Sequence, residues 1–414
     1  MSATESQPRA AQVAQIRFGA WSEDRDLALE FPAGWRIATC LPHDGPDIGA
    51  AGVQAAFDAP IGAPRLRELA RGRRSPCVVI DDLTRPTPGR RLVPAVLDEL
   101  RHAGIEARDV LLLAGVANHR PMTRPDLERK LGAEVLAACR VSNHFSWDHC
   151  VRIGTTSRGT PVEINAEFLD ADLRILVGSI IPHGGTGFSG GSKLLLPGIA
   201  SIASAEAFHR GAAARGRYGV LLTEARLEAD EAARMARVDF LVNSVPNSRM
   251  GIAGLVTGDV VAAHRAGVEI ARRVFASPTP AGNDVAVLSL YPKDGEFLQH
   301  LTAFAPWQTA PERIVREGGT LVVALDGSEG LGFHSLFGPG MRLAAPRATR
   351  VKGRDLVFFS PCVDGGSLPA PARDETLLFR TWEETLAWLR AKHGDEASVA
   401  VFPCATMQLA EAVC

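Results

Sequence analysis

The sequence predicts an α/β fold with two α/β domains and mainly parallel sheets, and three observations lead to this prediction. Short apolar runs alternate with longer segments of helical periodicity almost throughout the 414 residues, which is typical of βαβ units. Hydrophobic residues make up 46% and charged residues 22% of the chain, as in globular proteins with a sizeable core. The 40 glycines and 27 prolines, against only 6% aromatic residues, indicate tight turns and ligand-carrying loops.

The first half of the chain contains three predicted strands, each followed by a polar loop. Apolar runs predict buried strands over residues 77–80, 109–114 and 173–181, and a helix over 94–102. In open α/β sheets the ligand crevice lies outside the carboxyl ends of the strands. We therefore expect the loops that start at Asp81, Gly115 and Pro182 to converge on one site.

The second half repeats this alternation after a linker. Periodicity predicts a helix over 259–275 with Asp259 as its N-cap, and the Pro/Gly-rich residues 277–282 follow it. Further strands are predicted over 285–290, 321–325, 356–359 and 399–402, and a helix over 382–392. The expected division is a catalytic domain over 1–279 and a smaller domain over 280–414, whose last residues could pack back on the first. The active site is expected in the cleft between the domains.

Charge and cysteine content exclude several classes of protein. The formal net charge of −2 gives no general reason to bind nucleic acid or an anionic membrane. The seven cysteines include no C-x-x-C pair, so neither a disulfide framework nor a structural zinc cluster is indicated. The first 12 residues lack the pattern of a signal peptide and no apolar run is long enough for a membrane span. These features predict a cytoplasmic protein.

A glycine-rich segment, Pro-His-Gly-Gly-Thr-Gly-Phe-Ser-Gly-Gly-Ser-Lys, occupies residues 182–193. Its backbone amides and the hydroxyls of Ser189 and Ser192 could bind a phosphate, although the G-x-x-x-x-G-K-[ST] spacing of a P-loop is absent. A glycine-rich turn with a surface lysine is the simpler interpretation. The alternative is that Lys193 enters an apolar segment, loses water and acquires the lowered pKa that suits covalent attachment.

The other two loops carry candidate acids, bases and cations. In Asp-Asp-Leu-Thr-Arg-Pro-Thr-Pro at 81–88, Asp82 could orient a histidine and Arg85 could bind a carboxylate, whereas a capped turn with an internal Asp–Arg pair fits equally well. Histidines near strand ends or just after the glycine-rich segment favour proton transfer: His119, His144, His183 and His209. A zinc site is the alternative, but the compact spacing of common zinc sites is missing.

Together these segments resemble the lactate racemase family, enzymes that carry a nickel-pincer nucleotide. The resembling motifs are D-D-x-T-R-P-T-P at 81–88, N-H-R-P-M-T at 118–123, P-H-x-x-x-G-F-S-G-G-x-K at 182–193 with P-G-I at 197–199, and G-D-V-V-A-A-H-R-A-G at 258–267. The long glycine-lysine motif is the most specific of them. The second domain resembles the family more loosely, through residues 292–299 and 329–330.

The resemblance implies a role for each candidate residue. It implies that Lys193 tethers the cofactor through a thioamide and that His209 is the protein ligand of nickel. His119 and His183 would be the paired acid/base residues, with Asp82 supporting His119. The remaining implied contacts are Arg85 and Gln299 to the substrate, and Ser189, Gly190, Gly191 and Thr84 to the cofactor. Such a site suits a carbon of low acidity, because hydride transfer to the cofactor accompanies removal of the hydroxyl proton.

Two positions depart from the family pattern. Thr302 stands where the lactate-acting pattern has a lysine, and Ser192 stands where an arginine is frequent. We therefore expect an isomerase, a racemase or epimerase of a 2-hydroxy acid other than lactate. A longer or hydroxylated acid such as a sugar acid fits these positions, and an acid with an apolar side chain is the alternative. Its expected partners are that small molecule and the cofactor-synthesis proteins. The alternatives are a zinc- or nucleotide-dependent enzyme of small carboxylates and a non-catalytic protein that binds carboxylate or phosphate metabolites.

Four aromatic or histidine side chains lie on predicted loops of the second domain: Trp307, Phe333, His334 and Phe337. They could line the substrate side of the site, and packing in the core or anchoring of a loop explains them equally well.

Overall fold

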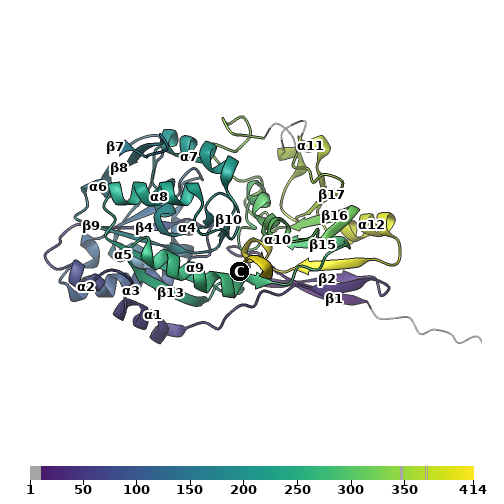
Figure 1. The fold of residues 1–414 in the computed structure, drawn as a ribbon, viewed down its shortest axis with the longest axis horizontal. Helices are drawn as coiled ribbons and strands as arrows, with labels where there is room; N and C mark the ends of the chain where they lie inside the picture. The colour runs from purple at the N-terminus through teal and green to yellow at the C-terminus, as the bar shows by residue number, and fades with distance from the viewer. Residues whose placement is uncertain (1–10, 346–347, 369, 371) are drawn as a thin grey trace, which may run out of the picture. The chain divides into compact units, whose positions relative to one another are not determined.

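The computed structural model describes residues 11–345, 348–368, 370 and 372–414. The chain forms two compact units, each with a six-stranded sheet (Figure 1). The larger unit comprises residues 42–276, 333–343 and 413–414, and the smaller unit comprises the chain up to Leu41 with 277–332 and 344–412. No helix among the described residues has the length and apolarity needed to cross a membrane.

These units differ from the single division predicted at 279/280. The early strand β3 (Arg36–Thr39) pairs in parallel with the late strand β19 (Ser398–Phe402), so the first described residues belong with the second half of the chain. Residues 333–343, from the predicted second domain, belong instead to the larger unit. Both differences depend on contacts between residues that are far apart in the sequence.

The sheet of the larger unit has the strand order β13-β12-β9-β4-β5-β6. Its neighbouring strands are parallel except for the antiparallel pair β12–β13. The three strands predicted in the first half are confirmed, each to within two residues at either end. The strands are β4 (Pro76–Asp81), β5 (Leu111–Gly115), β6 (Arg140–Asn143), β9 (Leu173–Ser179), β12 (Phe240–Pro246) and β13 (Ile252–Gly258).

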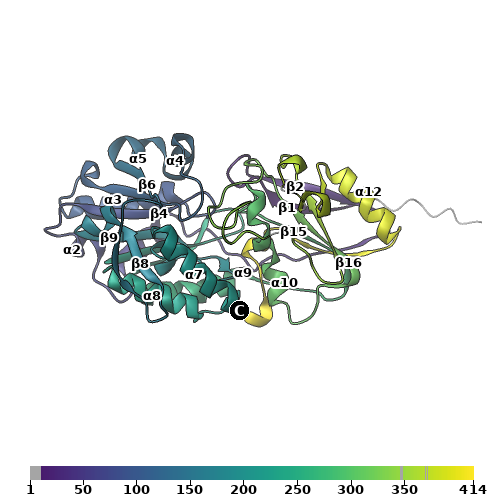
Figure 2. The ribbon, with the colours of Figure 1, turned by 90° about the horizontal axis from the view of Figure 1, so that it is seen from above.

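Helices cover both faces of this sheet, and Figure 2 shows α3, α4 and α5 on one side of it and α7, α8 and α9 on the other. On the first side, Val93 and Val96 of α3 pack with Val78 and Ile80 of β4 in one apolar cluster. The helices are α1 (Gly49–Asp58), α2 (Leu66–Leu69), α3 (Gly89–His102), α4 (Arg124–Leu131), α5 (Ala133–Ala138), α6 (Ala166–Asp170), α7 (Ile202–Arg215), α8 (Glu224–Met235) and α9 (Ala262–Phe275), with 3-10 turns η1 (Ala107–Asp109) and η2 (Gly191–Leu194). Two antiparallel hairpins, β7 (Cys150–Thr155) with β8 (Pro161–Asn165) and β10 (Pro182–His183) with β11 (Gly187–Phe188), complete the unit.

Two helices of the larger unit begin elsewhere than predicted. The predicted helix over 94–102 lies within α3, which already begins at Gly89, so Pro94 stands inside the helix. Helix α9 begins at Ala262 rather than directly after Asp259. The Asp259 carboxylate nevertheless accepts hydrogen bonds from the amides of Val261 and Ala262, so it still binds the first amides of the helix.

The smaller unit has an all-parallel sheet of order β18-β17-β16-β15-β19-β3. Alternate residues of β15 face two different clusters, since Val285 and Val287 pack with the hairpin β1–β2 while Ala286 and Leu288 pack in the other cluster. The strands predicted in the second half and the helix over 382–392 are confirmed. The elements are β1 (Gln12–Phe18), β2 (Arg25–Phe31), β15 (Asn283–Ser289), β16 (Val315–Ala324), β17 (Asp355–Phe359), β18 (Leu377–Phe379), β20 (Leu409–Ala410), α10 (Ala305–Thr309), α11 (Ala372–Glu375), α12 (Trp382–His393), η3 (Phe297–Phe304), η4 (Gly365–Ser367) and η5 (Ala405–Met407), with β14 (Ala276–Ser277) at the boundary and η6 (Glu411–Val413) at the end.

Candidate active site

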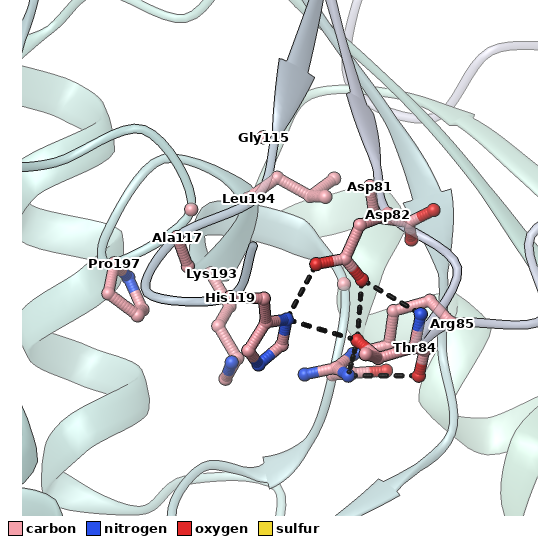
Figure 3. Close-up of a pocket in the computed structure, with 13 residues that line it drawn as sticks. Asp81, Asp82, Thr84, Arg85, Gly115, Ala117, His119, Lys193, Leu194 and Pro197 are labelled. Atoms are coloured by element: carbon pink, nitrogen blue, oxygen red, sulfur yellow. Dashed lines mark hydrogen bonds and ion pairs between the residues drawn. The ribbon is translucent and has the colours of Figure 1, made fainter. Parts of the chain in front are cut away.

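Three loops that follow β4, β5 and β9 meet at one pocket of the larger unit (Figure 3). Because these strands are parallel neighbours, their carboxyl ends lie at the same edge of the sheet. The expected convergence of the three loops is therefore confirmed. The lining residues are Asp81, Asp82, Thr84, Arg85, Gly115, Ala117, His119, Ser189, Gly190, Lys193, Leu194, Pro197 and Gly198.

A carboxylate and a histidine form a close pair in this pocket. His119 Nδ1 lies 2.5 Å from Asp82 Oδ2, and Figure 3 shows the two side chains facing each other. Burial raises the pKa of the Asp82 carboxyl, but the charges of His119 and Arg85 and the hydrogen bonds from His119 and Thr84 outweigh burial and hold this pKa well below its usual value. Asp82 is therefore ionised and keeps the Nδ1 proton of His119 directed at itself.

Thr84 and Arg85 complete the loop after β4. The Thr84 hydroxyl donates to Asp82 Oδ1 and accepts a 2.7 Å hydrogen bond from Arg85 Nη1. It also lies 3.3 Å from His119 Nδ1. Thr84, for which the resemblance implies a cofactor contact, thus links the carboxylate, the histidine and the arginine to one another.

A buried lysine that the sequence analysis did not single out supports the same loop. Lys130 of α4 is 1% exposed; its Nζ lies 2.9 Å from Asp81 Oδ1 and donates to the carbonyls of Asp82 and Arg85 at 2.8 Å each. Burial lowers the pKa of Lys130, and the charge of Asp81 opposes this effect. Asp81 is therefore paired with Lys130 and has a structural role.

Lys193 follows the glycine-rich segment, on η2, and its side chain reaches the pocket. Burial lowers the pKa of the Lys193 amine well below its usual value, and the charges of Arg85 and Arg226 lower it further. A depressed pKa increases the fraction of neutral, nucleophilic amine. The interpretation of Lys193 as a partly desolvated lysine is favoured over that of an ordinary surface lysine.

The donors of the glycine-rich segment bind the protein itself, which differs from the phosphate site predicted there. The Ser189 hydroxyl donates to Ser179 O at 2.7 Å, and the Ser192 hydroxyl donates to Asp230 at 2.7 Å. The Ser189 amide donates to Ile181 O at 2.8 Å. These donors are already occupied, so the segment offers a phosphate fewer hydrogen bonds than its sequence indicates.

The glycines at 190 and 191 are explained by close packing. Both have positive φ values, 71° and 57°, and a Cβ on Gly191 would lie 2.7 Å from His264. Buried side chains from α8 and α9 hold the segment: Arg226 donates to Gly190 O at 2.9 Å, and His264 Nε2 lies 2.9 Å from Ser189 O. His264 belongs to the motif at 258–267, so this motif helps to hold the glycine-rich segment in place.

His183, on β10, has a defined hydrogen-bonding state. Its Nδ1 accepts from the amides of Gly185 at 3.1 Å and Thr186 at 3.3 Å. In the neutral ring the proton is therefore on Nε2. His183 and His119 thus have opposite tautomers, since His119 directs Nδ1–H at Asp82.

His209 of α7 has the tautomer that a metal ligand needs. Its Nδ1 lies 2.6 Å from the carbonyl of Ala205, so Nδ1 carries the proton and the lone pair is on Nε2. Burial and, to a smaller extent, the charge of Lys193 lower the pKa of His209 to about 4, against the hydrogen bond to Ala205, which raises it. A neutral imidazole whose other nitrogen donates to a carbonyl is the usual arrangement of a metal-binding histidine.

A third histidine joins His119 and His209, and it comes from residues 333–343. The ring of His334 lies 5.2 Å from that of His119 and 6.2 Å from that of His209, measured between centroids. Phe337 packs on His334 and His209 at 4.7 and 5.3 Å. Of the four loop residues noted in the sequence, Trp307 instead packs in the core of the smaller unit.

The remaining implied site residues do not line this pocket. Gln299 and Thr302 lie on η3 of the smaller unit, where Gln299 Nε2 donates to Glu296 at 2.9 Å and the Thr302 hydroxyl donates to Gln299 O at 2.8 Å. His144 is buried, with its Nε2 2.9 Å from the carbonyl oxygen of Ala200, and it has a structural role. Within the described part of the chain, no cluster of three or more His, Cys, Asp or Glu could hold a metal, so a zinc site made by the protein alone finds no support there.

Known proteins are similar to this chain over most of its length. A family model described as the lactate racemase N-terminal domain matches residues 24–218. The lactate racemase of Lactiplantibacillus plantarum is 34% identical over 293 residues, 68% of each chain. The lactate racemase of Thermoanaerobacterium thermosaccharolyticum is 32% identical over 296 residues, which cover 69% of this chain and 68% of that protein.

Solved structures have the same fold. The structure of the lactate racemase apoprotein from T. thermosaccharolyticum matches 96% of this chain and 100% of that chain, with a TM-score of 0.75 at 23% identity. A crystal structure of a Thermotoga maritima protein matches 84% and 98%, with a TM-score of 0.62 at 16% identity. The relatives named lactate racemase place this chain in the isomerase class of enzymes. The chain belongs to the lactate racemase family.

Proposed function

We propose that this protein is a racemase or epimerase of a 2-hydroxy acid other than lactate, and that it works with a lysine-tethered nickel-pincer nucleotide. The two relatives named lactate racemase support the reaction class. The observation that carries the proposal is the pocket in which the His119–Asp82 pair, Arg85 and Lys193 meet. The departure at Thr302 supports a substrate other than lactate.

The residues present fit such a cofactor. Lys193 offers an amine of depressed pKa for the covalent attachment, and His209 offers an Nε2 lone pair for a metal. When bound, the cofactor supplies an electrophilic carbon that takes up hydride from C2 of the substrate. The protein would then hold this group from η2 and α7, two elements of the same unit.

The protein's own groups bind the substrate and move its proton. Arg85, whose guanidinium is planar, is suited to bind the carboxylate. His119 has Nδ1–H directed at Asp82, so its Nε2 can accept the proton of the C2 hydroxyl. For His183 to return a proton on the opposite face, its ring must begin the reaction as imidazolium, with Nδ1 protonated and no longer accepting from the amides of Gly185 and Thr186.

Intact mass tests the tethered cofactor. We expect a covalent adduct on the chain when it is made together with the cofactor-synthesis proteins, and loss of this adduct in Lys193→Arg. The matched control Lys352→Arg, outside the pocket, should keep the adduct. An unmodified wild-type chain made in this way would refute the cofactor assignment and would favour a zinc- or nucleotide-dependent enzyme, or a non-catalytic metabolite-binding protein.

Inversion at C2 tests the reaction. The nickel-loaded protein is expected to invert C2 of at least one acid in a panel of 2-hydroxy acids, with lactate a poor substrate. His119→Ala and His183→Ala should each abolish interconversion while the mass adduct remains. Turnover that is unchanged in either variant would refute the role assigned to that histidine.

A further inference from the structure

We propose that His334 is an additional substrate-binding residue, and that its Nε2 donates a hydrogen bond to a hydroxyl oxygen on C3 of the substrate. The proposal rests on the proposed function and narrows its substrate class to 2,3-dihydroxy acids, of which glycerate is the smallest. His334 is far from the other site residues in sequence and would act beside His119, which lines the pocket.

The segment that carries His334 is fixed to the site at two places. His334 forms an antiparallel bridge with His119, and the Ser335 amide and hydroxyl donate to the backbone and side-chain oxygens of Asn118 at 2.8 and 3.2 Å. At its other end, Arg342 pairs with Glu206 of α7 at 2.8 Å. The segment therefore connects the loop of the proposed base with the helix of the proposed metal ligand.

The ring of His334 is oriented by its own segment. Its Nδ1 accepts from the amides of Leu336 at 3.1 Å and Phe337 at 3.2 Å. The ring is therefore neutral with the proton on Nε2, on the side of the ring away from those amides. The ring makes T-shaped contacts with both His119 and His209, so this donor belongs to a ring that lies beside the two histidines.

Among the described residues, this N–H group makes no hydrogen bond, although His334 is only 8% exposed. The donor is therefore available to a ligand oxygen, and a site that offers a donor to a substrate hydroxyl discriminates against the analogue that lacks this hydroxyl.

The position of His334 beside His119, and the neutral charge of its ring, together indicate which substrate oxygen it binds. His119 takes the proton of the C2 hydroxyl in the proposed reaction, and Arg85 binds the carboxylate on C1. The next oxygen that can lie close to His119 is on C3. A neutral donor is suited to an uncharged hydroxyl, whereas a second carboxylate would leave its charge uncompensated at this place.

Glycerate and lactate provide a matched test, because they differ by one oxygen on C3. With nickel-loaded enzyme, we expect the ratio of kcat/KM for inversion at C2, glycerate over lactate, to exceed one in the wild type. It should fall about tenfold or more in His334→Phe, which keeps the ring contacts but loses Nε2–H. His334→Gln, which restores a donor, should recover part of the ratio. An unchanged ratio in both variants would overturn the proposal.

A second measurement does not depend on turnover. In the holoenzyme with 15N-labelled histidine, the Nε2 signal that disappears in His334→Phe should shift on addition of glycerate and stay in place with lactate. No shift at saturating glycerate would overturn the assignment of His334 even if C2 of glycerate is inverted. Absence of inversion with every 2-hydroxy acid would instead refute the proposed function, and this proposal with it.

Discussion

His119 Nδ1 and Asp82 Oδ2 lie 2.5 Å apart, across the ends of two neighbouring parallel strands. The contact depends on the order of the sheet, because β4 and β5 each end at the pocket and bring the two loops together. Asp82 is buried yet ionised, and its second oxygen is held by Thr84. The carboxylate therefore fixes both the rotamer and the tautomer of His119.

Replacing this carboxylate should remove the base without removing the histidine. In Asp82→Asn the amide NH2 can donate to Nδ1, which moves the ring proton to Nε2 and leaves no acceptor for the substrate. We expect kcat for inversion at C2 to fall about 100-fold or more, with the mass adduct on Lys193 retained. Thr84→Val is the control and should lose less, since it keeps the carboxylate. Unchanged kcat in Asp82→Asn would contradict the support role of Asp82.

The tautomer of His209, with its lone pair on Nε2, predicts that this residue is needed for nickel binding. His209→Ala removes the Nε2 lone pair, so the nickel bound per chain, measured by elemental analysis after gel filtration, should fall about tenfold or more. His149→Ala is the matched control because the His149 side chain is 77% exposed, and it should leave nickel unchanged. Full nickel content in His209→Ala would show that another group binds the metal.

The sequence could predict the parts of the fold and site that depend on local patterns. Buried strands are continuous apolar runs, and the chemistry at their ends stands directly after them, so β4, β5 and β9 and the convergence of their loops could be derived. The paired roles of His119 and Asp82 needed the family resemblance, because the octapeptide at 81–88 fits a capped turn equally well. The pocket now shows the carboxylate facing the histidine.

Contacts between distant residues could not be predicted in this way. Lys130 and Arg226 each stand in a charged stretch of an amphipathic helix, where a surface position is the normal expectation. Their burial is set by the loops that fold over them. The return of residues 333–343 to the larger unit has no local signal either, and the glycines at 190 and 191 fit a phosphate site until the buried neighbours His264 and Arg226 are known.

The buried pair of Lys130 and Asp81 predicts a large loss of stability. Lys130→Met leaves the Asp81 carboxylate buried without its cation, which typically costs about 3–5 kcal/mol of unfolding free energy. Urea unfolding of the larger unit should show this loss. The double variant Lys130→Met/Asp81→Asn should recover part of it, because no buried charge remains. If the double variant is as unstable as the single one, packing rather than charge explains the role of Lys130.

Asp294 predicts a pH dependence of stability in the smaller unit. Burial and, to a smaller extent, the charge of Asp326 raise the pKa of Asp294 to about 7, against hydrogen bonds from the amides of Gly19 and Ala20 that lower it. In the unfolded chain the pKa is near 3.8, so between pH 4 and 7 the folded state binds more protons. The free energy of unfolding must therefore fall as the pH rises through this window and level off above pH 7.

Asp294→Asn removes the titration while keeping a similar shape. Relative to the wild type, its free energy of unfolding should increase from pH 4 to pH 7 by up to about 4 kcal/mol, the product of about 3 pKa units and 1.36 kcal/mol each. Chemical denaturation at pH 4, 5.5, 7 and 8 measures this difference. Asp395→Asn, at a side chain that is 90% exposed, should show no such trend. A constant difference between Asp294→Asn and the wild type at all four pH values would mean that Asp294 is already ionised in the folded protein at pH 4, with its charge stabilised by the amides of Gly19 and Ala20.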